Sequence, residues 1–167
     1  MTITIDSRSA KQPSTLAPLA AAIADRRDSC VAALARTREN AERHAALNSI
    51  AWVDWDAAAA AAARIDAEIA AGRLSGPLTG VPISIKDLFQ VDGMPTRAGT
   101  RARLPALGPR ESSLVRRLRE AGALIFAKTN MHEIALGATG ENEWTGDVLN
   151  PHDPARQSGG SSSGGGA

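Results

Sequence analysis

The chain has 167 residues, of which 43% are apolar and 3% aromatic, and its formal net charge is +1. This length suffices for one domain with a hydrophobic core. The near-neutral charge without a basic tract argues against a nucleic-acid-binding protein. No apolar run approaches the length that spans a membrane, and residues 1–13 lack the apolar segment of a secretory signal. Cys30 is the only cysteine, so no internal disulfide can form, and a reducing, cytoplasmic location is expected.

Helices dominate the expected structure of the N-terminal half. Residues 1–13 are polar and irregular and are expected to be mobile, whereas residues 14–167 are expected to form part of one domain. Apolar periodicity and capping residues define the elements that follow. In chain order they are a helix from Ser14 or Thr15 through Ile23, a helix from Asp28 to about Ala46, a strand over Asn48–Val53, and an alanine-rich helix over Ala57–Ala71 capped by Asp54 or Asp56.

A short apolar strand follows the break at Gly76–Pro77. Val81, Ile83 and Ile85 alternate with smaller or less apolar residues, which is the two-residue period of a strand. The strand therefore delivers the next residue, Lys86, to its carboxyl end.

Lys86 is a candidate general base. Only three of the nineteen basic residues are lysines, and lysine, unlike arginine, can lose its proton when it is buried. The alternative is a lysine whose ammonium group extends from the core to water, and this stretch alone favours that alternative. Asp87 is interpreted as a helix cap or the partner of a nearby amide rather than as an acid or base.

A second strand is expected after a loop and a helix. Turn-forming residues fill Val91–Thr100, a helix starts near Glu111–Ser112 with Gly122 at its C′ position, and Ala123–Ala127 is a fully apolar run. A strand, a connection containing a helix and another strand favour an α/β fold with a parallel pair. Lys128 is expected to end the second strand and pair with a carboxylate.

The C-terminal region offers few regular elements. Met131–Leu136 is expected to form a short helix, and its His132–Glu133 pair lacks the second histidine of a zinc motif, so no metal site is expected. Asn150–Pro151 and Asp153–Pro154 are expected to be turns. The final stretch, Ser158–Ala167, is compatible with a flexible linker, a phosphate-binding loop or a catalytic serine loop, and its spacing does not choose among them.

Three blocks together resemble the amidase signature family, in that family's order, over about residues 50–166. They read GPLTGVPISIKDLFQVDGMPTRAGT, LVRRLREAGALIFAKTNMHEIALG and ENEWTGDVLNPHDPARQSGGSSSGG. The resemblance covers the N-terminal half of the family only. It implies a mixed α/β sheet sandwiched by helices. It also implies hydrolysis of carboxamide C–N bonds by a Ser–cis-Ser–Lys triad without a cofactor.

The resemblance also assigns residues. Lys86 matches the family lysine, and Ser161, which follows Gly159 and Gly160, matches the bridging serine of a cis peptide. Ser162 and Ser163 are candidates to hydrogen-bond substrate or backbone. The nucleophilic serine belongs to a later family block that is absent from these 167 residues. The sequence is therefore interpreted as a truncated portion that is inactive by itself.

Three functions remain open at this point. The first is an amidase acting on a small-molecule amide. The second is the A subunit of the tRNA-dependent amidotransferase, which releases ammonia from glutamine with the same triad. The third is a non-catalytic product that binds a partner or forms a homo-oligomer. Neither a nucleic acid nor a membrane is an expected partner of these residues.

Overall fold

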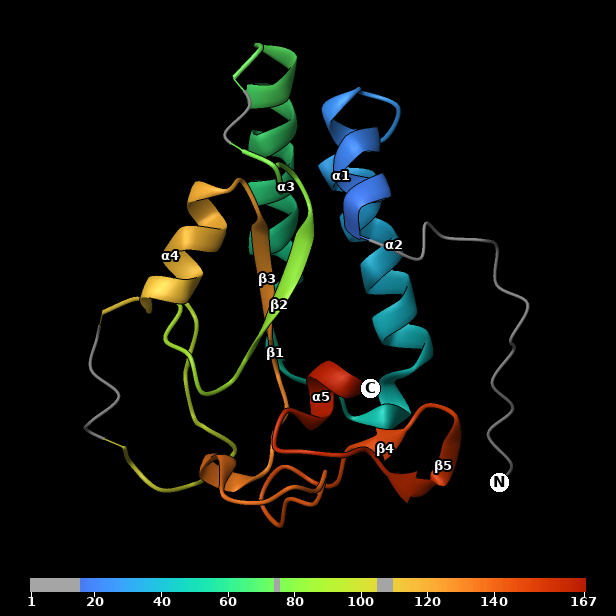
Figure 1. Ribbon diagram of the computed structural model, residues 1–167, viewed down its shortest axis with the longest axis vertical. Coiled ribbons are helices and arrows are strands. Elements are labelled where there is room, and N and C mark those ends of the chain that lie inside the picture. The colour runs from blue at the N-terminus through green and yellow to red at the C-terminus, as the bar shows by residue number, and fades with distance from the viewer. Residues whose placement is uncertain (1–15, 74–75, 105–109) are drawn as a thin grey trace.

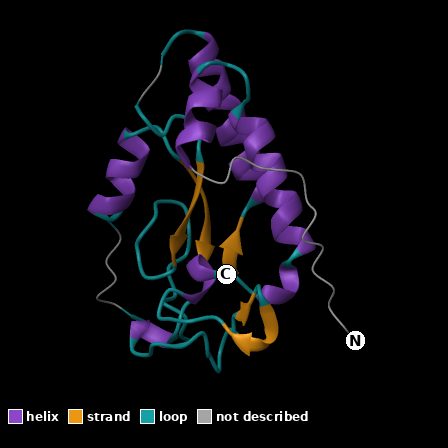
Figure 2. Ribbon diagram, turned by 45° about the vertical axis from the view of Figure 1, so that its right-hand side comes forward, coloured by secondary structure: helices purple, strands orange, loops and turns teal. Residues whose placement is uncertain are grey.

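The computed structural model describes residues 16–73, 76–104 and 110–167. The segment expected to be mobile, residues 1–13, lies outside the described residues. A three-stranded mixed sheet runs through the middle of the molecule, with helices on both sides and a small two-stranded hairpin near its base (Figures 1 and 2). The expected α/β fold with a mixed sheet between helices is confirmed.

The elements follow the expected chain order with a few additions. They are α1 (Leu16–Ala24), α2 (Cys30–Arg43), the 3₁₀ turn η1 (Ala45–Leu47), β1 (Ile50–Val53), α3 (Trp55–Ala70), β2 (Pro82–Lys86), α4 (Ser113–Glu120), β3 (Leu124–Thr129), the 3₁₀ turn η2 (Glu133–Ala135), β4 (Leu149–Asn150), β5 (Asp153–Gln157) and α5 (Ser163–Gly166).

The sheet has the order β1-β3-β2. β2 and β3 are parallel and are connected through α4, as the sequence predicts, whereas β1 is antiparallel to β3. Every residue of the central strand β3 is buried, which explains why its sequence is continuously apolar before Lys128. The carboxyl ends of β2 and β3 consequently lie at the same edge of the sheet.

Side-chain caps set where the helices begin. The Asp54 carboxylate accepts hydrogen bonds from the backbone amides of Asp56 and Ala57, so Asp54, not Asp56, is the cap of α3. The α2 helix ends at Arg43, three residues earlier than expected, because the chain passes into η1 and then a left-handed turn at Asn48 (φ 56°).

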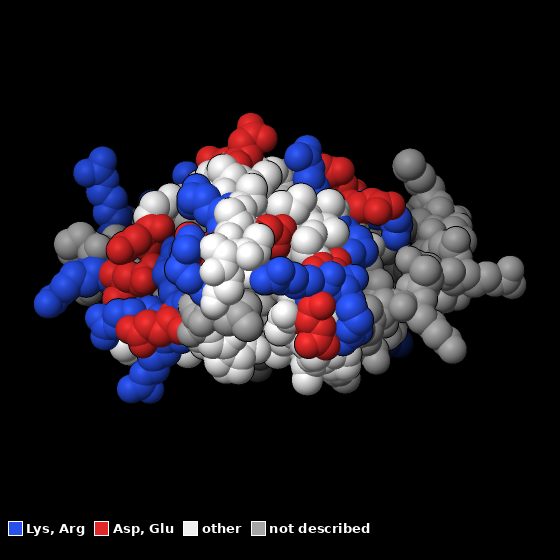
Figure 3. Space-filling view, turned by 90° about the horizontal axis from the view of Figure 1, so that it is seen from above, with Lys and Arg blue, Asp and Glu red and all other residues white. Residues whose placement is uncertain are grey.

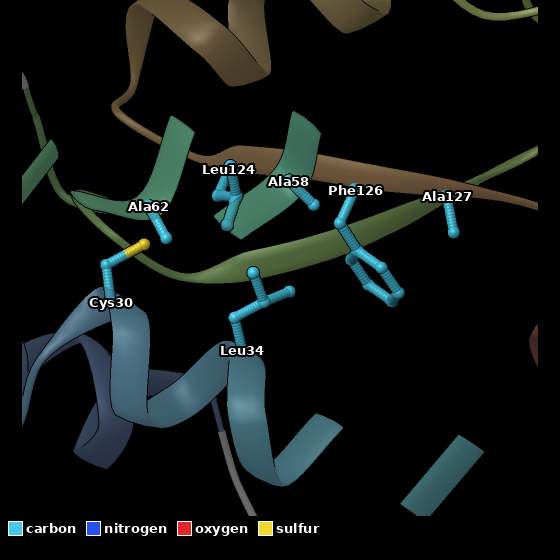
Figure 4. Close-up of a cluster of buried hydrophobic side chains, with 7 residues drawn as sticks. All are labelled: Cys30, Leu34, Ala58, Ala62, Leu124, Phe126 and Ala127. Atoms are coloured by element: carbon cyan, nitrogen blue, oxygen red, sulfur yellow. The ribbon is translucent and has the colours of Figure 1, made fainter. Parts of the chain in front are cut away.

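The hydrophobic core lies on both faces of the sheet. One cluster joins α2 and α3 to β3 (Figure 4) and consists of Cys30, Leu34, Ala58, Ala62, Leu124, Phe126 and Ala127. Small alanine side chains on α3 let that helix approach both α2 and the sheet. Burial raises the pKa of the Cys30 thiol to about 12, so the thiol stays protonated. The opposite face packs under α4 through Ile85, Val91, Val115, Ala123 and Ile125.

Two expectations for the C-terminal region are wrong. Asp153–Pro154 is not a turn but the start of β5, which pairs with β4 across the turn after Asn150. Pro154 is tolerated as the second residue of β5, because Asp153 and Gln157, and not Pro154, are the residues of β5 that pair with β4. The expected helix over Met131–Leu136 is reduced to the single turn η2, because Ile134 and Ala135 have positive φ angles of 40° and 62°.

The surface carries mixed charges. Acidic and basic side chains are interspersed on the face seen in Figure 3, and ion pairs such as Arg38–Glu42 join some of them. Within the described ranges, no helix is both long and apolar enough to cross a bilayer.

Candidate active site

Lys86 and Ser161 meet at the carboxyl end of β2. Lys86 is the last residue of that strand, and Ser161 lies in the loop that leads into α5. The Lys86 Nζ donates a hydrogen bond of 2.7 Å to the Ser161 Oγ across 75 positions of sequence. The Gly160–Ser161 peptide bond is cis. The fold therefore brings together two residues that only the family resemblance had linked.

The surroundings of Lys86 favour an uncharged amine. The side chain is half-buried, and this burial lowers the pKa of its ammonium group below the ordinary lysine value. Among the described residues, the only hydrogen-bond partner of Nζ is the Ser161 hydroxyl, and no carboxylate forms an ion pair with it. A lowered pKa increases the fraction of neutral amine, the form that can accept a proton.

Backbone contacts hold the loop that carries Ser161. The Gly160 amide donates to the Ala138 carbonyl at 2.8 Å, and the His132 amide donates to the Ser161 carbonyl at 3.1 Å. A Cβ atom at Gly160 would overlap the backbone carbonyl of Thr139. The glycine is therefore needed for the close approach of these two segments.

The neighbouring serines face different surroundings. Ser162 is exposed and, with Gly159 and Gly160, lines an open cavity of about 410 Å³. Ser163 is fully buried, and its hydroxyl lies 3.5 Å from the Asn130 carbonyl oxygen, to which it donates. Of the two roles that the sequence left open for Ser163, the structure shows the bond to backbone.

A second lysine lies beside this site on the neighbouring strand. Lys128 is 0% exposed, and its Nζ donates to Asp87 Oδ1 (2.9 Å), Thr96 Oγ1 (2.8 Å) and the Pro95 carbonyl (3.1 Å). The expected pairing of Lys128 with a carboxylate is confirmed. Asp87 also accepts from the Arg97 amide at 3.1 Å, which confirms its expected amide partner, but the sequence interpretation missed its ion pair with Lys128.

Asn130 is a structural residue that the sequence interpretation did not single out. Its amide donates to the Ser49 carbonyl, its side chain donates to the Asn48 carbonyl, and its own carbonyl accepts from the Gly164 amide at 2.9 Å. One residue thus ties the start of β1 to the C-terminal serine segment. The only signal in the sequence was an asparagine placed directly after a buried strand.

Within the ranges that the structure describes, no group of three or more histidine, cysteine, aspartate or glutamate side chains is arranged to hold a metal ion. The groups in contact at the centre of this site are instead the Lys86 amine and the Ser161 hydroxyl. Such a set suits proton transfer between a lysine and a serine.

The chain resembles curated amidotransferase proteins. A sequence model described as Amidase matches residues 32–167. The glutamyl-tRNA(Gln) amidotransferase A subunit of Acidothermus cellulolyticus is 42% identical over 154 residues, which cover 90% of this chain and 30% of that protein. The corresponding protein of Azoarcus sp. is 45% identical over 124 residues, or 74% of this chain and 25% of the relative. The chain therefore spans less than a third of the length of these relatives.

Solved structures agree with these sequence matches. A crystal structure of an amidase has a TM-score of 0.86 and 52% identity, covering 89% of this chain and 34% of that one. The peptide amidase of Stenotrophomonas maltophilia has a TM-score of 0.80 and 32% identity, covering 91% of this chain and 33% of that one. Because the Amidase family model matches most of the chain and the fold is shared with solved amidases, the chain belongs to the amidase signature family.

Proposed function

We propose that these residues supply the base, Lys86, and the bridging serine, Ser161, of an enzyme that hydrolyses carboxamide C–N bonds without a cofactor. The observation that carries this proposal is the 2.7 Å hydrogen bond between Lys86 Nζ and Ser161 Oγ. A serine alcohol is a weak nucleophile that needs a base. Burial of Lys86 moves its pKa in the direction that this role requires.

The proposed proton path runs through the Ser161 hydroxyl, which can accept and donate at once. The nucleophile is a serine outside these 167 residues. As its oxygen attacks the amide carbonyl carbon, its proton passes to Ser161 Oγ, and the Ser161 proton passes to neutral Lys86. The reverse transfer protonates the leaving nitrogen, the C–N bond breaks, and water then hydrolyses the acyl-enzyme.

The first test is substitution of Lys86 in the full-length protein. Lys86→Ala is expected to lower amide hydrolysis by a factor of about 10²–10⁴ or more, the usual contribution of a general base, with an unchanged melting temperature. Lys86→Arg is expected to fail as well, because a guanidinium group does not become neutral near pH 7. Release of ammonia or amine is the measurement, and near-normal turnover by a folded Lys86→Ala protein would refute the assignment.

The second candidate function is glutamine hydrolysis in a tRNA-dependent amidotransferase. The 42% identity to a protein named as the A subunit of such an enzyme supports this candidate. Glutamine hydrolysis by the full-length protein should then increase when partner subunits are added. Efficient turnover of aliphatic or aryl amides by the protein alone would favour a stand-alone amidase.

A polypeptide of these 167 residues alone is expected to have no amidase turnover. Its base and bridging serine would lack a nucleophile held beside oxyanion-stabilising donors, one of which contributes about 3 kcal/mol. Loss of reactant positioning removes up to roughly 7–11 kcal/mol more. The assay is ammonia or amine release from a panel of aliphatic and aryl amides. Amide turnover by this polypeptide that disappears in its Ser161→Ala variant would contradict the prediction and show that another serine completes the site. An absence of turnover is also what a non-catalytic binding product would show.

A further inference from the structure

Asn142 is a buried residue at a point where three segments of the chain meet. It belongs to the loop between η2 and β4, at the base of the molecule (Figure 1), and is 5% exposed. Its Nδ2 donates hydrogen bonds of 2.9 Å to the carbonyls of Gly99 and Met131. Its Oδ1 accepts from the amides of Trp144 and Thr145 at 2.9 and 3.0 Å. Both ends of the buried carboxamide are therefore fully used.

These four partners require a carboxamide. Two carbonyl oxygens face its nitrogen and two backbone amides face its oxygen, so a carboxylate would place an oxygen against the two carbonyls. An apolar side chain of the same size would leave all four backbone groups without this partner. Gly99 is also adapted to the contact, because its φ angle is 66° and a Cβ atom there would lie 2.7 Å from Asn142 Nδ2. The close approach of the two residues therefore requires a glycine.

Gly99 belongs to a loop that is fixed beside Lys86. The residue before it, Ala98, donates its amide to the carbonyl of Asp87 at 3.0 Å, and Asp87 directly follows Lys86. The Ala98 carbonyl accepts from the Ile134 amide at 2.8 Å, which connects this loop to η2. One hydrogen bond of the carboxamide nitrogen therefore reaches a segment that is bonded to the residue next to the proposed base.

Met131 belongs to the segment that holds Ser161. This methionine is 0% exposed, and the residue after it, His132, donates its amide to the Ser161 carbonyl at 3.1 Å. The loop between η2 and β4 also contacts the serine segment directly, because the Ala138 carbonyl accepts from the Gly160 amide at 2.8 Å. The second hydrogen bond of the carboxamide nitrogen therefore reaches the segment that fixes the bridging serine.

We propose that Asn142 is a positioning residue that sets the separation between Lys86 and Ser161. This inference rests on the proposed function of these two residues as base and bridging serine. The 2.7 Å hydrogen bond between Lys86 Nζ and Ser161 Oγ joins residues that are 75 positions apart, so it depends on how their segments are held together. One nitrogen atom of Asn142 is bonded to both segments. A misplacement of about 1 Å in a reacting group can lower a rate by about 10²-fold.

The test compares Asn142→Asp with a matched control in the full-length protein. Asn142→Asp keeps the shape of the side chain but replaces the two donor hydrogens with an oxygen that faces two carbonyls. The control is Asp66→Ala. It also removes two bonds between a side chain and the backbone, because the Asp66 carboxylate accepts from the amides of Cys30 and Val31. These bonds connect α3 to the start of α2 and involve neither of the two segments at the site.

Three properties of each variant are measured: kcat and KM of amide hydrolysis below the melting temperature, the melting temperature, and a crystal structure. The structure gives the distance between Lys86 Nζ and Ser161 Oγ without reference to turnover. Asn142→Asp is expected to lengthen this distance beyond about 3.2 Å, the usual limit of such a hydrogen bond. The kcat value should fall by about 10²-fold with KM within about twofold of the parent value, because the proton transfer occurs only in the transition state.

Asp66→Ala should also lower the melting temperature but leave the distance, kcat and KM near those of the parent protein. If Asn142 served stability alone, the two variants would have the same kinetics and the same distance. An unchanged distance in folded Asn142→Asp protein, or an equally longer one in Asp66→Ala, overturns the inference.

The outcomes also separate this inference from the proposed function. A longer distance with an unchanged kcat supports the role of Asn142 but refutes Lys86 and Ser161 as base and bridging serine. If Asn142→Asp does not fold, Asn142→Ser is the second variant. Its side chain is too short to bond to both carbonyls and places no carboxylate oxygen against them, and the same distances and rates decide the result.

Discussion

At the residue scale, the Lys86 amine is set apart by what surrounds it. Its one hydrogen-bond partner among the described residues is a neutral hydroxyl, and burial lowers its pKa. Burial also lowers the pKa of the Lys128 ammonium group on the neighbouring strand, but there the Asp87 carboxylate in contact with it opposes this shift. Two residues of one type are thus suited to different tasks by burial and by the charge of their neighbours.

This environment predicts the pH dependence of hydrolysis by the full-length protein. The proposed base must be neutral, so activity is lost as the pH falls through the Lys86 pKa and Lys86 becomes protonated. Because burial lowers this pKa, the midpoint of the acidic limb is expected below the ordinary lysine value of about 10.4. The measurement is kcat/KM against pH. A midpoint at or above the ordinary value would contradict the proposed base.

At the scale of elements, Gly164 lets α5 pack against the residues that flank β1 and β3. The Gly164 amide donates to the Asn130 carbonyl, and a Cβ atom at Gly164 would overlap the backbone carbonyl of Ser49. At Gly165 a Cβ atom would meet nothing within 4 Å. Adjacent glycines of the same short helix therefore differ in their tolerance of a side chain.

Gly164→Ala is expected to lower the free energy of unfolding by about 1–3 kcal/mol, the usual range for inserting a methyl group into a packed site. The displaced α5 would also move the loop that holds Ser161, so hydrolysis by the full-length protein is expected to fall. Gly165→Ala is the matched control and should preserve both properties. Chemical denaturation and amide hydrolysis are the two measurements, and equal behaviour of the two variants would contradict this packing argument.

At the scale of the whole molecule, β2 is an edge strand among the described residues. It pairs with β3 on one side, and the sheet order ends there. Edge strands present unpaired amide and carbonyl groups that can pair with another chain. The relatives are about three times longer than the matched region, so this edge is not expected to be equally exposed in proteins of that length.

A polypeptide of only these 167 residues is therefore expected to aggregate or to assemble with a second copy. Light scattering after size-exclusion chromatography reports its mass, and a thermal melt reports its cooperativity. The full-length protein, measured at the same concentration, is the control. A monodisperse monomer with a sharp cooperative melt would count against this prediction.

Sequence patterns local to each segment predicted much of the fold. The alternation in Val81–Ile85 predicted β2, the apolar run after Gly122 predicted β3, and the helix between them predicted their parallel pairing. These elements can be predicted because burial of one or both faces of a helix or strand produces a regular pattern of apolar residues in the sequence. Lys128 at the end of an apolar run likewise indicated a buried charge that needs a carboxylate.

The family motifs, rather than the spacing of residues, linked Lys86 to Ser161 before the structure did. Only the tertiary structure decided their 2.7 Å contact, the choice of Lys128 as the partner of Asp87, and the use of Asp54 to cap α3. It also decided that Asp153–Pro154 begins a strand. Some of these contacts join side chains that lie far apart in the sequence. Others, such as the cap of α3, involve one of two similar residues that lie close together in the sequence. The sequence alone determined most of the helices and the three strands of the central sheet, because their burial leaves a periodic pattern in the chain. The packing of those elements determined which polar groups meet, because contacts between distant segments leave no such pattern.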